Sequence, residues 1–135
     1  MCVGSIYDTG EENNAFDAVL VENVFHHIDN YEDALRELSR ILVPGGVLCF
    51  VEPRNSLASR TLDYVTFHTP VPRMLRGPWA LRQKVMGEEF ETGLYPLWLK
   101  SHQRFFGLLE QYFHLTWTKK TLFFYVGKAE NEKSS

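Results

Sequence analysis

The sequence contains few of the features that mark secreted, membrane-spanning or nucleic-acid-binding proteins. Only two cysteines, Cys2 and Cys49, occur in 135 residues, too few for a disulfide framework, and Cys49 lies in an apolar run that suggests a small buried thiol. No apolar run is long enough to cross a bilayer, and no signal peptide precedes the acidic N-terminal region. The net charge of −3 argues against general nucleic-acid binding. We therefore expect one small cytoplasmic domain.

The charge that is present is distributed unevenly along the chain. Residues 1–53 hold 2 Lys+Arg and 10 Asp+Glu, whereas residues 54–100 hold 7 Lys+Arg and 4 Asp+Glu. The middle segment is therefore the part most suited to an anionic partner or a membrane surface. A solvated basic face is the simpler interpretation, and both remain open.

Two short apolar segments have the composition of β-strands. Residues 15–21 (AFDAVLV) are almost wholly apolar after Asp17, and residues 47–52 (VLCFVE) form a second such run. Continuous apolar strands are typical of parallel sheets that are covered on both faces. We therefore predict two strands that are buried on both sides.

The segment between these strands has the pattern of a helix. Residues 30–42 carry apolar side chains at helical spacing, and Asn30 is a suitable N-cap. Pro44 cannot continue a helix, and Gly45 and Gly46 can adopt the positive φ that a tight exit requires. Strand, helix and strand in this order predict a right-handed βαβ unit with parallel strands.

Polar residues follow both predicted strands at the point where each strand ends. Glu22 and Asn23 follow the first strand, and Glu52, Pro53 and Arg54 end the second. The carboxyl ends of parallel strands lie side by side, and open α/β sheets bind their ligands there. The sequence therefore predicts a ligand site at this edge of the sheet.

The remaining residues add a cap and an antiparallel closure. Residues 54–100 mix helical patterns with proline and aromatic residues, which predicts a partly helical insertion over the ligand site. Residues 101–113 predict a helix capped by Ser101, and residues 113–129 predict two strands joined at Lys119 and Lys120.

Residues 16–53 carry a Phe-Asp strand start, a double histidine, a helix and a Pro-Gly-Gly strand entry in one register. This stretch resembles the class I S-adenosylmethionine-dependent methyltransferases, in particular their small-molecule group. The resemblance implies an α/β fold with a Rossmann-like sheet and a terminal antiparallel hairpin. It implies a partial methyltransferase domain over residues 1–128, and the polar composition of residues 129–135 predicts a disordered tail.

The resemblance also implies S-adenosylmethionine as cofactor and assigns residues to it. Residues 3–8 resemble the end of the family's third strand, which would place Ser5 and Ile6 beside the adenine ring. Glu22 and Asn23 would lie near the methionine part. The family's glycine-rich turn and ribose-binding carboxylate precede the third strand, so we expect weak cofactor binding and impaired transfer in this chain. The alternative is a non-catalytic remnant or interaction module that associates through an exposed sheet edge.

The acceptor of the methyl group would be a small molecule held by the polar strand ends and the cap. The double histidine admits three interpretations: pocket lining, a general base for an acceptor hydroxyl, or a metal pair. Adjacent histidines rarely bind one ion, so no metal site is expected. Glu52 and Arg54 form either a local ion pair or part of the acceptor pocket. The predicted acceptor-site residues are His26, His27, Glu52, Arg54, Arg73 and Trp79.

Overall fold

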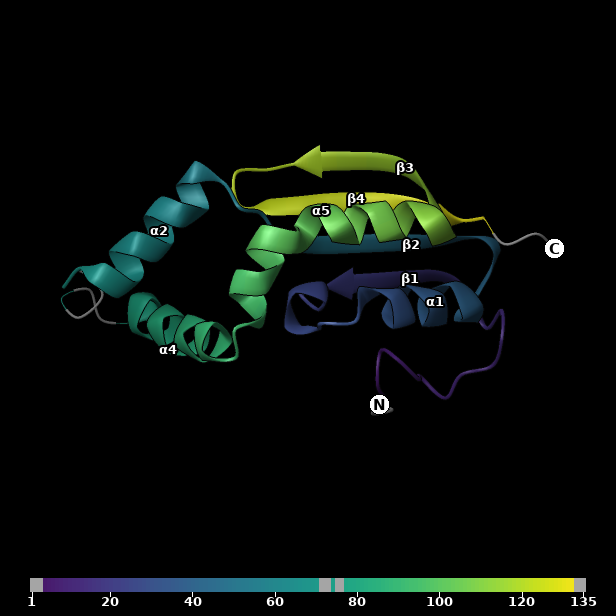
Figure 1. Ribbon diagram of the computed structural model, residues 1–135, viewed down its shortest axis with the longest axis horizontal. Coiled ribbons are helices and arrows are strands. Elements are labelled where there is room, and N and C mark those ends of the chain that lie inside the picture. Colours follow the sequence, from purple (N-terminus) through teal and green to yellow (C-terminus); the bar gives the residue numbers. More distant parts are fainter. Residues whose placement is uncertain (1–3, 71–73, 75–76, 133–135) are drawn as a thin grey trace.

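The computed structural model describes residues 4–70, 74 and 77–132, and four strands form its central sheet in the order β1-β2-β4-β3 (Figure 1). The strands are β1 (Phe16–Glu22), β2 (Leu42–Pro53), β3 (Phe113–Lys120) and β4 (Phe124–Asn131). β1 and β2 are parallel, whereas β4 is antiparallel to both β2 and β3. The predicted βαβ unit and terminal antiparallel hairpin are therefore confirmed.

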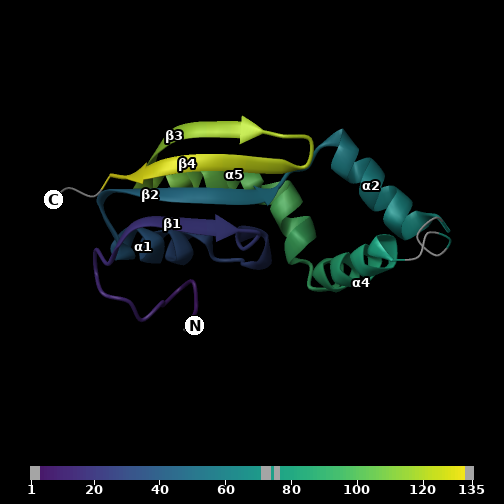
Figure 2. The same cartoon turned by 180° about the vertical axis from the view of Figure 1, so that it is seen from behind.

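Helices cover one face of this sheet and extend beyond its end. The helical elements are η1 (Phe25–His27), α1 (Tyr31–Ile41), α2 (Leu57–His68), α4 (Pro78–Glu91) and α5 (Leu94–Tyr112). Figure 1 shows α1 and α5 in front of the sheet, and Figure 2 shows the opposite face without a covering helix. α2, α4 and the start of α5 project past the carboxyl ends of β1 and β2 (Figure 1).

The prediction that both parallel strands are buried on two faces is wrong. In β1 the side chain of Val21 is buried against the helices, whereas Leu20, which points to the other face, is 67% exposed. β2 alternates in the same way, with Leu48 and Phe50 buried and Cys49 between them only half-buried. The strands are apolar on both sides, but among the described residues helices cover only one side.

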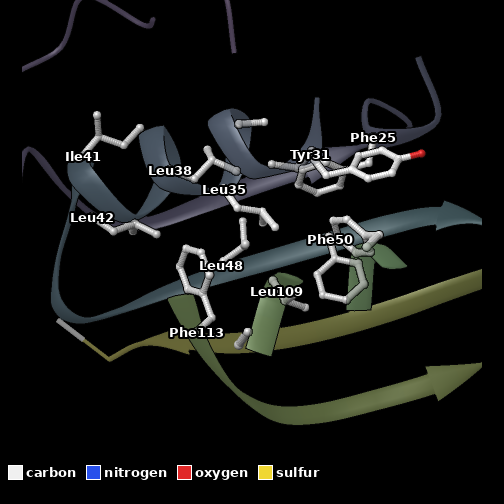
Figure 3. Packing of buried hydrophobic residues seen from close by; sticks show 14 of the residues in the cluster. Phe25, Tyr31, Leu35, Leu38, Ile41, Leu42, Leu48, Phe50, Leu109 and Phe113 are labelled. Atoms are coloured by element: carbon white, nitrogen blue, oxygen red, sulfur yellow. The ribbon is translucent and has the colours of Figure 1, made fainter. Parts of the chain in front are cut away.

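The core lies between that covered face and the two helices. Figure 3 shows Leu35 and Leu38 of α1 above Leu48 of β2, with Leu109 of α5 close by. Phe105 of α5 adds ring contacts to the core. Its centroid lies 4.5 Å from that of Phe25 and 5.7 Å from that of Phe50. These contacts fix α5 across β2, so the start of α5 is held beside the strand ends.

The connection from α1 to β2 follows the predicted chemistry. The Asn30 side chain accepts a hydrogen bond from the Asp33 amide, which confirms the N-cap. Gly45 has φ of 74°, and Gly46 is equally restricted because an added Cβ would lie 2.8 Å from the Val43 carbonyl oxygen. The sheet register jumps in this segment, so the three residues Pro44, Gly45 and Gly46 form a bulge at the start of β2.

Two predicted boundaries in the C-terminal part are wrong. α5 begins at Leu94 after Gly93, so Ser101 is not an N-cap, and its hydroxyl instead donates to the Leu97 carbonyl. β3 and β4 are joined by residues 121–123 and not at Lys119 and Lys120. In both cases a regular element extends further than the local sequence pattern indicated.

The predicted disordered tail also begins too early, because β4 continues to Asn131. Ala129 and Asn131 are buried. The side-chain Nδ2 of Asn131 donates to the backbone carbonyls of Ser39 and Leu42 at 2.9 and 3.1 Å, and its side-chain Oδ1 accepts from the Ser39 hydroxyl. The end of β4 therefore donates hydrogen bonds to carbonyl groups at the C-terminus of α1. The rest of the predicted tail, residues 133–135, lies outside the described residues.

The N-terminal segment is a turn and not a sheet strand. The Asp8 amide donates to the Ser5 carbonyl at 3.1 Å, and none of the described residues before Phe16 joins the four-stranded sheet. Glu37 of α1 holds the segment, because its carboxylate accepts from the Thr9 amide and hydroxyl. Hydrogen bonds from Arg40 are the main reason that the pKa of Glu37 is lowered from 4.5 to about 2.

No helix within residues 4–70, 74 and 77–132 combines the length and the apolar composition that crossing a bilayer requires.

Candidate functional site

A cavity of about 420 Å³ lies where the parallel strands end and the cap helices begin. It is lined by Asn23, His26, Pro53, Ser59, Leu62, Met86, Tyr95, Phe123 and Phe124. We call it the strand-end cavity. Its walls are mostly apolar, with a few polar groups contributed by the strand ends and α2. The predicted position of the ligand site, beyond the carboxyl ends of the strands, coincides with this cavity.

Glu52 organises the segment that follows β1. Its carboxylate is fully buried and accepts from the amides of Val24, Phe25 and His26 at 2.9, 2.8 and 3.3 Å. It also lies 2.8 Å from Nδ1 of the His26 ring. Three amides at the start of a helical turn form a natural anion site, which explains how a carboxylate can be buried there.

Glu52 thus acts on the site through other residues. The prediction paired Glu52 with Arg54 or placed it in the acceptor pocket, but the structure engages both oxygens with residues 24–26. Because its side chain is buried, the geometry gives Glu52 a positioning role for η1 and the His26 ring.

His26 is the titratable side chain that these contacts direct. It is buried, it lines the strand-end cavity, and its ring lies edge-on to Tyr95 with centroids 5.8 Å apart. When Glu52 is ionised, Nδ1 carries the hydrogen of this short contact, and the lone pair of the neutral ring is on Nε2. The neighbouring His27 is exposed and is not among the residues that line the cavity. The two histidines therefore have different surroundings.

Glu22 is the last residue of β1 and Asn23 follows it, and both are exposed. Asn23 has φ of 53°, a left-handed conformation that asparagine tolerates better than most residues. Its amide donates to the Val51 carbonyl at 2.8 Å, so the turn away from the sheet is tied to β2. The predicted residues Asn23 and His26 line one cavity, while Glu22 lies exposed beside it in the chain.

Ser5 and Ile6, the predicted adenine contacts, line a different cavity of about 470 Å³. This cavity lies between the N-terminal segment and β1, where Phe16 and Val19 contribute apolar walls. Ser5 is exposed and Ile6 is half-buried against the core. The structure therefore places the two groups of predicted cofactor residues at separate sites along β1.

Arg54 stabilises the loop between β3 and β4. Its guanidinium Nη1 donates to the Thr121 carbonyl at 2.7 Å, and its amide donates to the Phe123 carbonyl at 2.7 Å. The predicted acceptor contact of Arg54 is replaced by this role in the loop. Arg73 lies outside the described residues, and of Trp79 only the backbone position in α4 is described.

Sequence reasoning missed Tyr95, Ser59 and Phe124 as cavity residues. Tyr95 belongs to the first turn of α5, which the pattern placed in the irregular cap. Ser59 forms a capping box with Ser56 at the start of α2, a local signal that could have located this helix next to the strand end. Within the described parts of the chain, no three His, Cys, Asp or Glu side chains are placed to hold a metal ion.

Comparisons with known proteins give this geometry a context. Residues 1–50 match a family described as a methyltransferase domain. A 58-residue stretch is 40% identical to the ubiquinone/menaquinone biosynthesis C-methyltransferase UbiE of Pseudomonas fluorescens strain Pf0-1. That stretch covers 41% of this chain and 23% of the relative, so most of the relative has no counterpart in the alignment.

Two solved structures share the fold. The N-methyltransferase NodS of Bradyrhizobium japonicum WM9, in complex with S-adenosyl-L-homocysteine, matches 98% of this chain with a TM-score of 0.53 and 11% identity. The PH0226 protein of Pyrococcus horikoshii OT3 matches 96% with a TM-score of 0.54 and 16% identity. The chain spans 54% and 58% of these two structures. They confirm the predicted Rossmann-like α/β arrangement.

Proposed function

Because the chain belongs to the class I S-adenosylmethionine-dependent methyltransferase family, we propose that it transfers a methyl group to a small aromatic acceptor bound in the strand-end cavity. The observation that carries the proposal is the buried Glu52 carboxylate, which positions His26 at an apolar cavity beyond the strand ends. Pro53, Tyr95 and Phe124 provide flat apolar walls that suit a ring.

The chain offers groups for the cofactor at both ends of β1. Ser5 and Ile6 would contact the adenine side, where Phe16 and Val19 provide an apolar wall. Glu22 is an exposed carboxylate at the carboxyl end of β1 and would face the ammonium of the methionine part. S-adenosylmethionine, when bound, supplies a methyl group on a positively charged sulfur.

His26 would accept the proton that the acceptor loses. In the tautomer set by Glu52 the neutral ring has its lone pair on Nε2, so it can take a proton from a phenolic hydroxyl. The resulting oxyanion is a better nucleophile, and it also enriches the ring carbons beside it in electron density. The imidazolium that forms is stabilised by the adjacent Glu52 carboxylate.

We also propose that the chain by itself binds the cofactor weakly and transfers slowly. Among the described residues, the proposed cofactor contacts are divided between two cavities, because Ser5 and Ile6 line one and Asn23 lines the other. The first test is calorimetric titration of the chain with S-adenosylhomocysteine, for which we expect affinity weaker than micromolar. Micromolar affinity would contradict this part of the proposal.

The second test measures transfer directly. The chain is incubated with excess S-adenosylmethionine carrying a radiolabelled methyl group and with para-ethylphenol, and the labelled product is followed across pH. We expect His26→Asn to lower the rate by about 100-fold or more and to remove the rise of rate with pH. His114→Asn is the matched control, because His114 is exposed on β3. Equal rates for both variants would refute His26 as the base.

A second candidate function is an interaction module without catalysis. β1 is an edge strand in the described sheet, and Leu20 exposes an apolar side chain on the uncovered face. Such an edge could pair with a second copy of the chain. Light scattering across concentrations separates the candidates: association that Leu20→Lys abolishes, together with no methyl transfer under any condition, would favour the module.

A further inference from the structure

We propose that a cavity between α5 and β3 binds a small aromatic molecule with a carboxylate at one end and an ammonium group at the other. The cavity has a volume of about 270 Å³ and lies on the helix-covered side of the sheet, where β3 extends beyond α5 (Figure 1). We call it the α5–β3 cavity. Among the described residues it has no lining residue in common with the strand-end cavity, so the inference is independent of the proposed function.

The floor of the α5–β3 cavity consists of aromatic rings that hold one another in place. The Tyr125 ring stacks on His102 with centroids 5.5 Å apart and meets Phe106 edge-on at 5.4 Å. Nδ1 of His102 lies 3.2 Å from the Leu99 carbonyl oxygen, and this nitrogen donates because a carbonyl only accepts. The rings are therefore positioned before a ligand binds, which lowers the ordering cost of binding. Such a floor favours a flat apolar ring.

Lys120 gives one end of the α5–β3 cavity a positive charge. Its Cα is paired with that of Tyr125 in the sheet, so it lies at the end where Tyr125 stacks on His102. Successive residues of a strand point to opposite faces, and accordingly Lys120 lines the cavity whereas Lys119 does not. This end therefore attracts a carboxylate.

Glu110 gives the opposite end a negative charge. It follows His102 on α5 by a rise of about 12 Å along the helix axis. α5 leads directly into β3, where Leu115 lines the cavity at about 15 Å of extended strand from Lys120. The helix and the strand thus both place Lys120 and Glu110 at opposite ends, and the Glu110 end attracts an ammonium group.

These two charges have no partner of opposite sign in the described part of the protein. Neither Lys120 nor Glu110 takes part in an ion pair there. Gln103 and Thr118 add neutral hydrogen-bonding groups to the walls. A ligand with a single charge leaves one end unmatched, and a ligand with two like charges is repelled at one end. A zwitterion with a ring between its charges matches both ends and the floor.

The test is a titration of the isotope-labelled chain with para-(aminomethyl)benzoate, followed by nuclear magnetic resonance. Two matched probes carry one charge each: para-methylbenzoate lacks the ammonium group, and para-methylbenzylamine lacks the carboxylate. A partly exposed ion pair strengthens binding by about threefold, so the zwitterion should bind about threefold more tightly than either probe. We expect a dissociation constant on the order of 1 mM for this small ligand. The amide signals of His102, Lys120 and Tyr125 should shift, while those of Asn23 and Tyr95 at the strand-end cavity should not.

Two variants assign the charges to their residues. Lys120→Met should weaken the binding of the zwitterion and of para-methylbenzoate by about threefold without weakening that of para-methylbenzylamine. Glu110→Gln should weaken the zwitterion and para-methylbenzylamine by the same factor and spare para-methylbenzoate. Both residues are exposed, so the fold is retained. Lys119→Met and Glu88→Gln are the matched controls, because these residues are also exposed and line no part of the cavity.

Each other outcome of the titration overturns the inference. Equal affinity for the three probes shows that the two charges do not select the ligand. An equal loss of affinity in Lys119→Met and Lys120→Met shows attraction to the general charge of the surface. Shifts at the strand-end cavity that His26→Asn abolishes place the probe there, and the absence of saturable shifts up to the solubility limit of the zwitterion rejects the site. Titrations as expected, together with no methyl transfer, contradict the proposed function alone.

Discussion

Replacing Glu52 with alanine removes the acceptor for four N–H groups at once. In the structure the amides of Val24, Phe25 and His26 and Nδ1 of His26 all lie within 3.3 Å of its two carboxylate oxygens. Glu52 itself is 0% exposed, so water does not replace it without opening the strand end. The substitution therefore leaves several donors unsatisfied in a closed environment.

The size of the effect follows from these contacts. Each buried donor that loses its partner costs about 1–3 kcal/mol, and the costs of neighbours do not add fully. We therefore expect Glu52→Ala, which leaves four donors without their acceptor, to lower the free energy of unfolding by about 3–5 kcal/mol, a large part of the total for a small domain.

Glu52→Gln is a milder change with the same shape. The amide oxygen can still accept from Val24 and Phe25, and the His26 ring can change tautomer to accept from the new NH₂ group. The His26 amide, however, then faces a donor. We expect a loss of about 1–2 kcal/mol, intermediate between the parent and Glu52→Ala.

Urea denaturation followed by circular dichroism measures these differences, with midpoints compared at a common slope. Glu22→Gln is the control, because Glu22 is exposed and its substitution should change stability by less than about 0.5 kcal/mol. If Glu52→Ala is too unstable to analyse, the thermal midpoints of Glu52→Gln and Glu22→Gln still show which of the two carboxylates contributes more to stability. A parent-like midpoint for Glu52→Ala would show that the four contacts contribute little, and the reasoning about η1 would be wrong.

Three further predictions concern the scaffold. Gly127→Ala should lower the free energy of unfolding in urea by about 1–3 kcal/mol, because its Cβ would overlap Cζ of Phe50, and the double variant with Phe50→Leu should lose less than the sum of the two single losses. Gly45→Val should cost at least about 1 kcal/mol, because Gly45 has positive φ, and a thermal melt equal to the parent's would contradict this. Glu37→Gln should lower the free energy of unfolding by about 1 kcal/mol above pH 5, because hydrogen bonds from Arg40 lower the pKa of Glu37 in the folded state to about 2. The difference between parent and variant should vanish as pH falls from 4.5 towards 2, where the Glu37 carboxylate of the parent becomes protonated. A difference that stays constant across pH would refute the assignment.

The βαβ unit could be predicted because its signals are local. Asn30 caps the helix within its own turn, and Gly45 follows directly after Pro44, so each interaction depends on residues that are close in sequence. The parallel order of the strands then follows from the handedness of the crossover. The position of the strand-end cavity follows from the same strand directions, and its use as a ligand site stays a prediction.

The errors arise where distant segments decide the outcome. Residues 128–131 have the composition of a polar tail, yet Asn131 is buried because residues at the end of α1 and the start of β2, 88 or more positions earlier, present carbonyls to its side chain. β1 is apolar enough for a strand covered on both sides, but composition does not reveal which faces the helices cover. Arg54 was expected in an ion pair with Glu52 or in the acceptor pocket, because the partner of its guanidinium, the Thr121 carbonyl, comes 67 residues later and gives no local signal.

The polar stretch from Glu22 to Asp29 illustrates why a cluster of chemically active residues is not by itself a site. His26 and His27 are adjacent and alike in sequence, but only His26 is buried at the strand-end cavity. What separates them is Glu52, which lies at the end of the next strand and binds three amides and one ring nitrogen of the stretch. The buried Glu52 carboxylate at the end of β2 accepts hydrogen bonds from the amides of residues 24–26, at the start of the helical turn after β1. In that turn the His26 side chain is buried and the His27 side chain is exposed. A contact between two strand ends therefore determines which of the two histidines lines the strand-end cavity. In the sequence, a carboxylate at the end of the next strand is the signal that could identify that histidine.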